Sequence, residues 1–300
     1  MIATEIKESN LHKKVKFAGH ETFAFRYGWL KKAVDCLAGD RDIFSKDEAI
    51  VALGVGKNMV KSIKHWALAT QIFEGGKEGL RVSSLGKRLF NRWDPYLEDP
   101  ASLWLIHWLL ATNPSNAALW YLTFNKYPRP DFTKNQLLEF TLELTSKYDI
   151  KVLKSTVGRD IDCFIRTYLP TKGAKNHLEE TFSCPLNELS IISQLCDGES
   201  YQFNVGFKYS LPEHIAGYAL LNYIADTQNS RKTISVSDCL YGEGSPGQVF
   251  KLDENSLVEY IEVLQKITAD AIELDETAGL KQIYCKEEYP PEELLNSYYA

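Results

Sequence analysis

The sequence predicts a mainly α-helical protein with small β-hairpin wings, built as tandem winged helix-turn-helix-like modules around a helical middle. Amphipathic helical spacing recurs along most of the chain and is interrupted by turns that contain Gly or Pro. Near both ends, several such helices are followed by a short segment with the pattern of a β-hairpin. Hydrophobic residues form 44% of the 300 residues, which is enough for a substantial buried core.

Charge divides the chain into three segments, which we expect to be three domains. They are a basic winged-helix-like DNA-binding domain at 1–92, a helical middle domain with a second helix-turn-helix candidate at 93–180, and an acidic winged-helix-like domain at 181–300. In that order, Lys and Arg number 17, 10 and 7, whereas Asp and Glu number 10, 11 and 19. The basic end indicates a polyanionic partner, and the acidic end indicates a basic protein or a second copy in a homodimer. The alternative for the acidic end is a face that only confers solubility.

The basic segment has the helix order of a winged helix-turn-helix. A first helix follows Gly28, a capping box of Ser45 and Glu48 starts a second, and a third spans 57–70. A Gly-rich turn and a short strand at 80–82 then predict the wing. In such a module the second helix of the turn enters the major groove of DNA.

One side of that third helix is predicted to be basic. The residues that share it at helical spacing are Lys57, Asn58, Lys61, Lys64 and His65. We expect the first four to contact DNA together with Arg81 on the wing, because each lysine that neutralises a phosphate releases counterions. The alternative is the solvated face of a core helix, and some winged helices bind proteins instead of DNA.

The rest of the chain predicts more helices and a second hairpin. Residues 93–125 are rich in aromatic side chains and predict two central helices, in which His107 is expected to be a hydrogen-bonded core residue. The later predicted elements are helices at 133–147 and 156–168, a strand at 201–207, helices from about 213 to 226, from Ser235 and from Asp253 to 268, a loop at 242–248, and a hairpin of 271–274 with 280–285. The tail at 289–300 is expected to be a docking segment or a loose end.

The stretch FAGHETFAFRYGWLKK, Phe17 to Lys32, combines aromatic and charged residues at unusual density. Its aromatic residues have apolar spacing, so we expect them to fix the N-terminal arm to the first module. His20 and Glu21 are either a structural hydrogen-bonded pair or catalytic groups that act as acid and base or as metal ligands. The cationic residues expected to hold phosphate are Arg26, Lys31 and Lys32.

Complete motifs for catalysis are missing from the sequence. The loop GEGSPGQ lacks the Gly-Lys-Ser/Thr ending of a phosphate-binding loop, and Ala24 excludes a zinc-binding HExxH helix at His20. Neither a PD…(D/E)xK nor an HNH nuclease arrangement occurs, and the six cysteines are scattered singly. We therefore expect no cofactor, apart from a divalent metal if the protein nicks DNA.

Membrane and secretion signals are also missing. The longest strongly apolar run, Leu103 to Ala111, is shorter than the ~20 residues needed to cross a bilayer. Early charges and the lack of an apolar core distinguish the N-terminus from a secretion signal. The sequence therefore predicts a cytoplasmic protein without a membrane partner.

The motif GHETF, followed by an Arg and GWLKK, together with the later CPL…EL at Cys184 to Leu189, resembles the bacterial domain-of-unknown-function family 4007. Its members resemble the SspB-like component of single-strand DNA phosphorothioation systems, encoded beside a cysteine desulfurase, an ATPase and a PAPS-reductase-like sulfurtransferase. The resemblance implies a DNA-acting role in modification and anti-phage defence, with the sulfurtransferase and the ATPase as partners. The positions that match the motif are Gly19, His20, Glu21, Thr22, Phe23, Arg26, Gly28, Trp29, Leu30 and Lys31.

Three functions follow for testing. The preferred one is a DNA-binding component of a phosphorothioate modification system, which contacts DNA through its basic end and partner proteins through its acidic end. The second is a DNA nicking endonuclease of that system with His20 and Glu21 in the site. The third is an adaptor whose winged helices bind proteins and not DNA.

Overall fold

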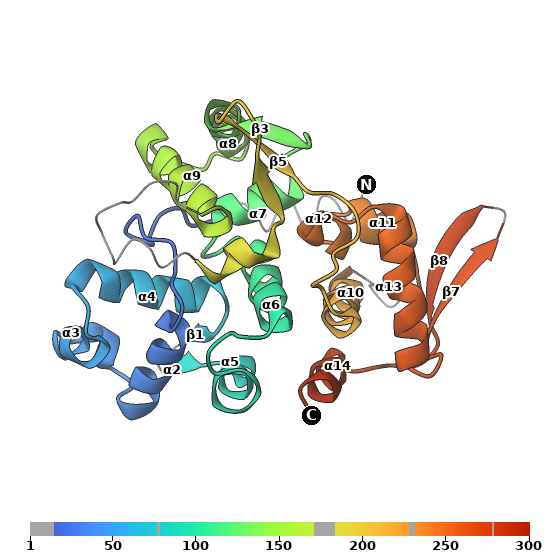
Figure 1. The fold of residues 1–300 in the computed structure, drawn as a ribbon, viewed down its shortest axis with the longest axis horizontal. Helices are drawn as coiled ribbons and strands as arrows, with labels where there is room; N and C mark the ends of the chain where they lie inside the picture. The colour runs from blue at the N-terminus through green and yellow to red at the C-terminus, as the bar shows by residue number, and fades with distance from the viewer. Residues whose placement is uncertain (1–14, 77–78, 171–183, 228–231, 278) are drawn as a thin grey trace. The chain divides into compact units, whose positions relative to one another are not determined.

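The computed structural model describes residues 15–76, 79–170, 184–227, 232–277 and 279–300, as Figure 1 shows. The protein is mainly helical with small antiparallel hairpins, which confirms the predicted fold class. It forms two compact units: unit 1 comprises Met1–Thr123 and Tyr127–Gln202, and unit 2 comprises Phe124–Lys126 and Phe203–Ala300. In the part of the chain that the structure describes, no helix is both long and apolar enough to cross a bilayer.

Three helices and a hairpin open unit 1 in the predicted order. They are α2 (Trp29–Gly39), α3 (Glu48–Leu53), α4 (Lys57–Ala69) and the antiparallel strands β1 (Phe73–Gly76) and β2 (Gly79–Val82). The capping box expected at Ser45 is wrong, because Ser45 ends a 3-10 helix (Ile43–Ser45) and α3 has no side-chain cap. Backbone hydrogen bonds close this tighter turn, with Lys46 N donating to Ile43 O at 3.0 Å.

The apolar side of α4 fixes this helix in the core of unit 1. Its Ile63 and Trp66 are 0% exposed. The Trp66 ring lies 5.4 Å from the ring of Phe25 and 5.4 Å from that of Trp120, measured between centroids. Phe25 of the N-terminal motif therefore packs on the first module, as the apolar spacing predicted, and α4 also joins this module to the middle of unit 1.

Helix α6 (Pro100–Ala111) forms the centre of unit 1, and every residue from Ala101 to Ala111 is buried. A helix that is apolar on all sides is expected in such a position. Nδ1 of His107 lies 2.9 Å from the hydroxyl of Tyr168, which confirms the prediction of a hydrogen-bonded core histidine. In sequence, α5 (Ser84–Arg88) and a π-helix (Leu89–Trp93) precede α6, and α7 (Ala118–Asn125) follows it.

Two further helices and a small sheet complete unit 1. The helices are α8 (Lys134–Lys147) and α9 (Lys154–Tyr168), and Thr133 and Gln136 form the capping box of α8. A 3-10 helix (Pro185–Leu189) follows later in the chain. The strands β3 (Asp131–Thr133), β4 (Ile192–Gln194) and β5 (Ser200–Phe203) form a sheet in the order β3-β5-β4.

Unit 2 combines helices with a second three-stranded sheet of order β6-β8-β7. Its elements are α10 (Glu213–Thr227), β6 (Thr233–Ser235), α11 (Val236–Tyr241), α12 (Pro246–Phe250), α13 (Glu254–Ile267), β7 (Ile272–Thr277), β8 (Leu280–Cys285) and α14 (Pro291–Tyr298). Asp253 caps α13 as predicted, since its side chain accepts from Ser256 N at 2.9 Å. The hairpin of β7 and β8 is also confirmed.

The structure corrects the loop expected at 242–248 and the loose end expected as one alternative for the tail. The predicted loop at 242–248 contains the start of α12, because Ser245 caps that helix and Pro246 suits its first turn. The tail is the helix α14, which packs on α10 with Leu294 and Leu295 at 0% exposure. A Cβ on Gly217 of α10 would lie 3.0 Å from Cδ1 of Leu294, so the glycine permits this close packing.

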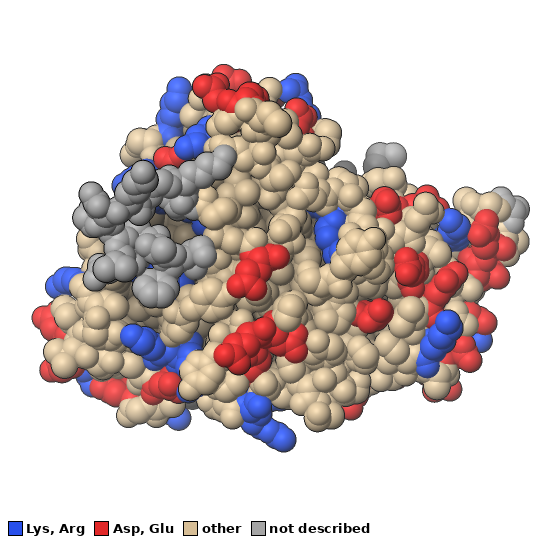
Figure 2. All heavy atoms as spheres, viewed as in Figure 1, with Lys and Arg blue, Asp and Glu red and all other residues tan. Residues whose placement is uncertain are grey.

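The two units and the three segments of different charge divide the chain differently. Residue 92 lies within unit 1, and residue 180 lies outside the described residues. Packing of α4 against the middle of the chain explains why the basic segment is not a separate compact unit. Acidic side chains do gather on unit 2, where Figure 2 shows them over α13 and the hairpin of β7 and β8.

Candidate nucleic-acid interface

The residues 17–23, which we call the motif loop, follow an unusual backbone path. Ala18, Glu21 and Thr22 have positive φ angles of 61°, 48° and 68°, and Gly19 has 101°. A non-glycine residue in this region is uncommon and costs on the order of 1 kcal/mol or more. Three such residues within five positions persist only because the surrounding structure holds them.

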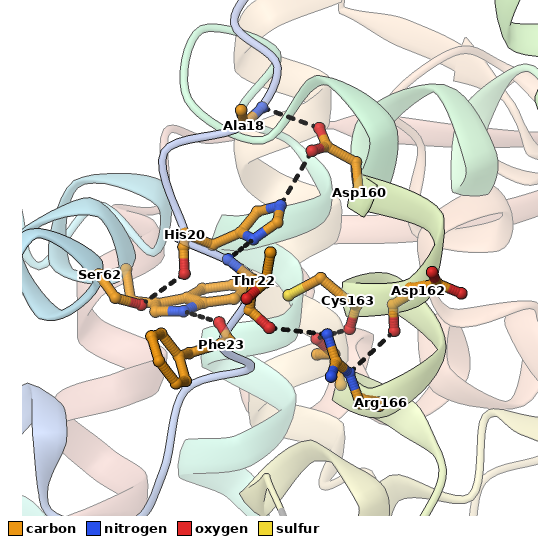
Figure 3. Close-up of polar contacts among 11 residues, drawn as sticks. Ala18, His20, Thr22, Phe23, Ser62, Asp160, Asp162, Cys163 and Arg166 are labelled. Atoms are coloured by element: carbon orange, nitrogen blue, oxygen red, sulfur yellow. Dashed lines mark hydrogen bonds and ion pairs between the residues drawn. The ribbon is translucent and has the colours of Figure 1, made fainter. Parts of the chain in front are cut away.

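Helix α9 holds one side of the motif loop (Figure 3). Asp160 accepts two hydrogen bonds of 2.9 Å, one from Nε2 of His20 and one from the backbone N–H of Ala18. Nδ1 of His20 accepts from Thr22 N at 3.0 Å, so the ring proton lies on Nε2. Six residues further along α9, Arg166 Nη2 donates to Thr22 O at 2.7 Å.

Helix α4 holds the other side of the motif loop. The hydroxyl of Ser62 donates to His20 O at 2.9 Å, and Nε1 of Trp66 donates to Phe23 O at 2.9 Å. Figure 3 shows Ser62 of α4 beside the loop at His20. The motif loop is therefore tied to two helices that lie far apart in sequence.

Gly19 allows the motif loop to lie directly on α4. A Cβ at this position would be only 2.5 Å from Nδ1 of His65. His65 is 6% exposed, so its expected place on the basic, exposed side of the helix is wrong. Burial, followed by the proximity of His20 and Lys16, lowers the pKa of His65 to about 3. The motif loop therefore covers the predicted basic side of α4 at His65, near the C-terminal end of the helix.

The structure separates the two candidate catalytic residues. His20 is 2% exposed and pairs with Asp160, whereas Glu21 is exposed with Oε1 3.8 Å from Lys61 Nζ. In this conformation the His20 ring is buried and is not accessible to a ligand. A catalytic role for the two residues stays a prediction, and the contacts favour the structural alternative, with Asp160 rather than Glu21 as the partner of His20.

Sequence reasoning missed Asp160 and Ser62 as parts of this site. A signal existed for Asp160, because it occupies a position between Val157 and Phe164 on the apolar side of α9. A carboxylate at such a position needs a buried partner. No comparable signal marks Ser62, because a small polar residue on a helix is common.

Helix α4 presents the predicted basic face, which consists of Lys57, Asn58, Lys61 and Lys64. The side chains of Lys57 and Lys61 are 71% and 57% exposed. Lys57 Nζ lies 3.5 Å from Asp47, and Lys61 Nζ lies 3.8 Å from Glu21. Exposed ion pairs at such distances stabilise a fold by less than about 1 kcal/mol, so a phosphate can replace the carboxylates.

The other cations predicted to contact DNA near α2 also have intramolecular neighbours, and Lys31 has the closest carboxylate. Nζ of Lys31 lies 2.5 and 2.7 Å from the carboxylate oxygens of Asp35, one helical turn away. The guanidinium of Arg26 lies 5.6 Å from the centroid of the Trp29 ring. Lys32 is exposed, with Nζ 3.4 Å from a backbone oxygen.

Arg81 of the hairpin also has an intramolecular partner. Its Nη2 lies 2.8 Å from Glu74 Oε2, directly across the two strands. Its side chain is nevertheless 76% exposed, so the guanidinium remains accessible.

A hollow of about 400 Å³ lies beside the motif loop, on the side of α9. Its lining residues are Thr22, Lys134, Arg159, Asp162, Ile165 and Arg166. Lys134 Nζ pairs with Asp162 at 2.6 Å. The charges of these two lining residues cancel, so Arg159 and Arg166 give the lining of the hollow a net positive charge. The sequence indicated α9 only as a weaker helix-turn-helix candidate and did not indicate Lys134.

The sequence and the structure were compared with known families and proteins. The family model described as "Protein of unknown function (DUF4007)" matches residues 17–299. Two solved structures are similar, both at 29% sequence identity. "SspB crystal structure" has a TM-score of 0.86 and covers 97% of this chain and 90% of that chain. "Magnesium ion-bound SspB crystal structure" has a TM-score of 0.87 and covers 96% and 90%. The search of curated proteins found no match.

Proposed function

Because the chain belongs to the family described as protein of unknown function (DUF4007), and because its structural neighbours are SspB, we propose that it is the DNA-binding component of a bacterial phosphorothioate modification and anti-phage defence system. The GHETF motif and its SspB-like family link the chain to that system. Contact with DNA is proposed for unit 1, and contact with partner proteins is proposed for the acidic C-terminal part.

The observation that carries the DNA-binding role is the basic face of α4. Lys57, Asn58 and Lys61 are exposed on one side of this helix, and the two lysines make only exposed ion pairs of 3.5 and 3.8 Å. Helix α4 follows α3 after a short turn and precedes the hairpin of β1 and β2, which is the order of a recognition helix and a wing. Backbone phosphates are the natural ligands of such a face, and the exposed Arg81 extends it.

The acidic C-terminal part suits protein partners, because its charge repels DNA. The sulfurtransferase and the ATPase of the system are the partners that we propose, and a homodimer is the alternative assembly. The magnesium ion named with one SspB structure belongs to that protein. Among the residues that the structure describes, no group of three or more His, Cys, Asp or Glu side chains is placed to hold a metal ion.

A charge-reversal variant tests the DNA-binding role. We expect Lys57→Glu, Lys61→Glu and Lys64→Glu together to weaken binding to duplex DNA by about 100-fold or more. The slope of log affinity against log salt concentration should become shallower by the amount that roughly two to three phosphate contacts contribute. The measurement is a fluorescence-anisotropy titration at several salt concentrations. The matched control is Lys232→Glu, Lys266→Glu and Lys286→Glu, which changes the net charge equally on unit 2.

The control separates a local contact from an effect of net charge. The proposal requires the control to bind DNA much more tightly than the α4 variant. Equal affinity of the α4 variant and wild type would refute the assignment and favour the adaptor that binds only proteins.

A further inference from the structure

Residues 204–209 of unit 2, which we call the aromatic loop, alternate between inward and outward side chains. Val205, Phe207 and Tyr209 are 58%, 37% and 97% exposed, whereas Gly206 and Lys208 are buried. Three apolar side chains that project together from one loop form an exposed patch, a feature that marks interaction sites.

A buried ammonium group organises the backbone of the aromatic loop. Nζ of Lys208 donates to Asn204 O at 2.6 Å, to Gly206 O at 2.7 Å and to Lys251 O at 3.2 Å. Gly206 N also donates to Lys251 O at 3.0 Å. These bonds fix the loop from the inside, so its outward side chains are held in place without a ligand.

Tyr260 of α13 packs against the aromatic loop and hydrogen-bonds to its backbone. Its ring is stacked against that of Phe207, with 5.4 Å between centroids and 9° between planes. Its hydroxyl lies 3.1 Å from Lys208 O and 3.2 Å from Leu211 O. Tyr209 in turn contacts the edge of Phe207, with ring centroids 5.3 Å apart. A partner would therefore meet ordered aromatic rings, which lowers the entropic cost of binding.

Carboxylates surround this patch. Asp253 Oδ2 lies 3.5 Å from the position that a Cβ of Gly206 would take. Glu259 directly precedes Tyr260 in α13, and Glu213 begins α10 two residues after Leu211, whose backbone oxygen accepts from the Tyr260 hydroxyl. Burial raises the pKa of Tyr260, and the negative charges of these two carboxylates raise it further. The rim of the aromatic loop is therefore acidic.

The rest of unit 2 extends this negative field. Residues 203–300 contain 16 Asp and Glu against 7 Lys and Arg. Two of those seven cations, Lys208 and Lys251, are buried and face inward. Figure 2 shows acidic side chains over α13, the helix that supports the loop. A phosphate backbone would be repelled by this surface, whereas a basic segment would be attracted.

We propose that Val205, Phe207 and Tyr209 form the docking surface for a partner-protein segment that carries lysine or arginine beside apolar side chains. The apolar side chains of that segment contact the exposed rings, and its cations meet the acidic rim of Glu213, Asp253 and Glu259. This proposal rests on the partner-binding role proposed for the C-terminal part and names the surface that performs it.

Labelled peptides test the docking surface on the full-length protein. The probe is a helical peptide with leucines on one side and lysines on the other, compared with a version in which Ser replaces Leu and another in which Glu replaces Lys. We expect the Leu/Lys peptide to bind and both altered peptides to bind at least tenfold more weakly by fluorescence anisotropy. Tyr209→Ser should weaken the Leu/Lys peptide about tenfold, as loss of a central aromatic contact does.

A matched variant controls for general effects on the surface. Tyr241→Ser also removes an exposed tyrosine of unit 2, one that is 68% exposed and lies outside the aromatic loop. Affinity for the Leu/Lys peptide should not change in this variant. Folding is not at risk in Tyr209→Ser, because the side chain is 97% exposed.

Several results would overturn the docking surface. They are no binding of the Leu/Lys peptide, equal binding of the Ser-containing peptide, or an unchanged affinity in Tyr209→Ser. A single-stranded oligonucleotide that loses affinity in Tyr209→Ser, while the peptide does not, would assign the loop to base stacking instead. If wild type binds lysine peptides regardless of Leu and Tyr209, the partner-binding role of the acidic part stands and only this surface fails. Duplex-DNA titrations run in parallel report separately on unit 1.

Discussion

His20 and Asp160 show at the residue scale how the GHETF motif works as structure. Each side chain is 2% exposed, and each completes the other's hydrogen bonds. Together with the Ala18 and Thr22 backbone amides, they hold a loop with several left-handed residues between α4 and α9. Removing one partner leaves a buried polar group without its bond, which costs more than the bond itself contributes.

Replacement of His20 by alanine should therefore destabilise the fold. We expect His20→Ala to lower the free energy of unfolding by about 3 kcal/mol, because it leaves the Asp160 carboxylate buried with fewer partners. Urea denaturation followed by circular dichroism measures this change. Glu21→Ala is the control. Its side chain is exposed and pairs with Lys61 at 3.8 Å, so its removal should change the free energy of unfolding by less than about 1 kcal/mol.

The same variant distinguishes structure from catalysis. A His20→Ala protein with wild-type stability that had lost a plasmid-nicking activity of the wild type would contradict the structural role and support the endonuclease alternative. Loss of stability in His20→Ala, with no such loss in Glu21→Ala, would support the role described here.

At the scale of elements, apolar spacing predicted the helices well because one face of each is buried. Helix α4, the capped helices α8 and α13 and the hairpin of β7 and β8 all occur where the pattern indicated. Two of the failures involve tertiary contacts. His65 follows the exposed stripe of α4, yet the motif loop covers it. Likewise, α14 is held by the packing of Leu294 on α10, which its sequence alone does not specify.

The site was predictable only in part for the same reason. Lys57, Asn58 and Lys61 lie on an exposed face of α4, as their spacing predicted. The pairing of His20 with Asp160 joins residues 140 positions apart, so no local pattern could reveal it. The alternating exposure of the aromatic loop depends on the buried ammonium of Lys208, which a sequence pattern presents as an ordinary strand.

Lys251, at the C-terminal end of α12, makes unit 2 sensitive to pH. Its Nζ donates to Phe124 O at 2.6 Å and lies 4.5 Å from the centroid of the Phe203 ring. Burial lowers its pKa to about 7, whereas in the unfolded chain it is about 10.4. Between these values the unfolded state binds more protons, so stability should rise as the pH rises.

A pH series on a variant that lacks the Lys251 ammonium tests this expectation. We expect the free energy of unfolding of the wild type to increase by up to about 1.4 kcal/mol per pH unit from pH 7 to pH 9 on account of Lys251. Lys251→Met keeps the aliphatic packing and should show a clearly smaller increase in urea titrations at the same pH values. Parallel pH curves for the two proteins would rule out Lys251 as the source.

At the scale of the whole molecule, a net charge of −6 conceals surfaces of opposite sign. Unit 1 carries the basic face of α4, and unit 2 carries the acidic surface around the aromatic loop. We propose that the first contacts DNA and the second contacts protein, so the two functions differ in their response to salt and to mutation. In this proposal, DNA lies on α4.

Chemical acetylation of lysines, with and without saturating duplex DNA, tests this claim most directly when the modified peptides are quantified by mass spectrometry. We expect DNA to protect Lys57 and Lys61 several-fold, because both side chains are exposed in the free protein. Lys266 and Lys286 of unit 2 are exposed as well and should react equally in both conditions. Unchanged acetylation of Lys57 and Lys61 at saturating DNA, or protection of Lys266 and Lys286 instead, would contradict this claim.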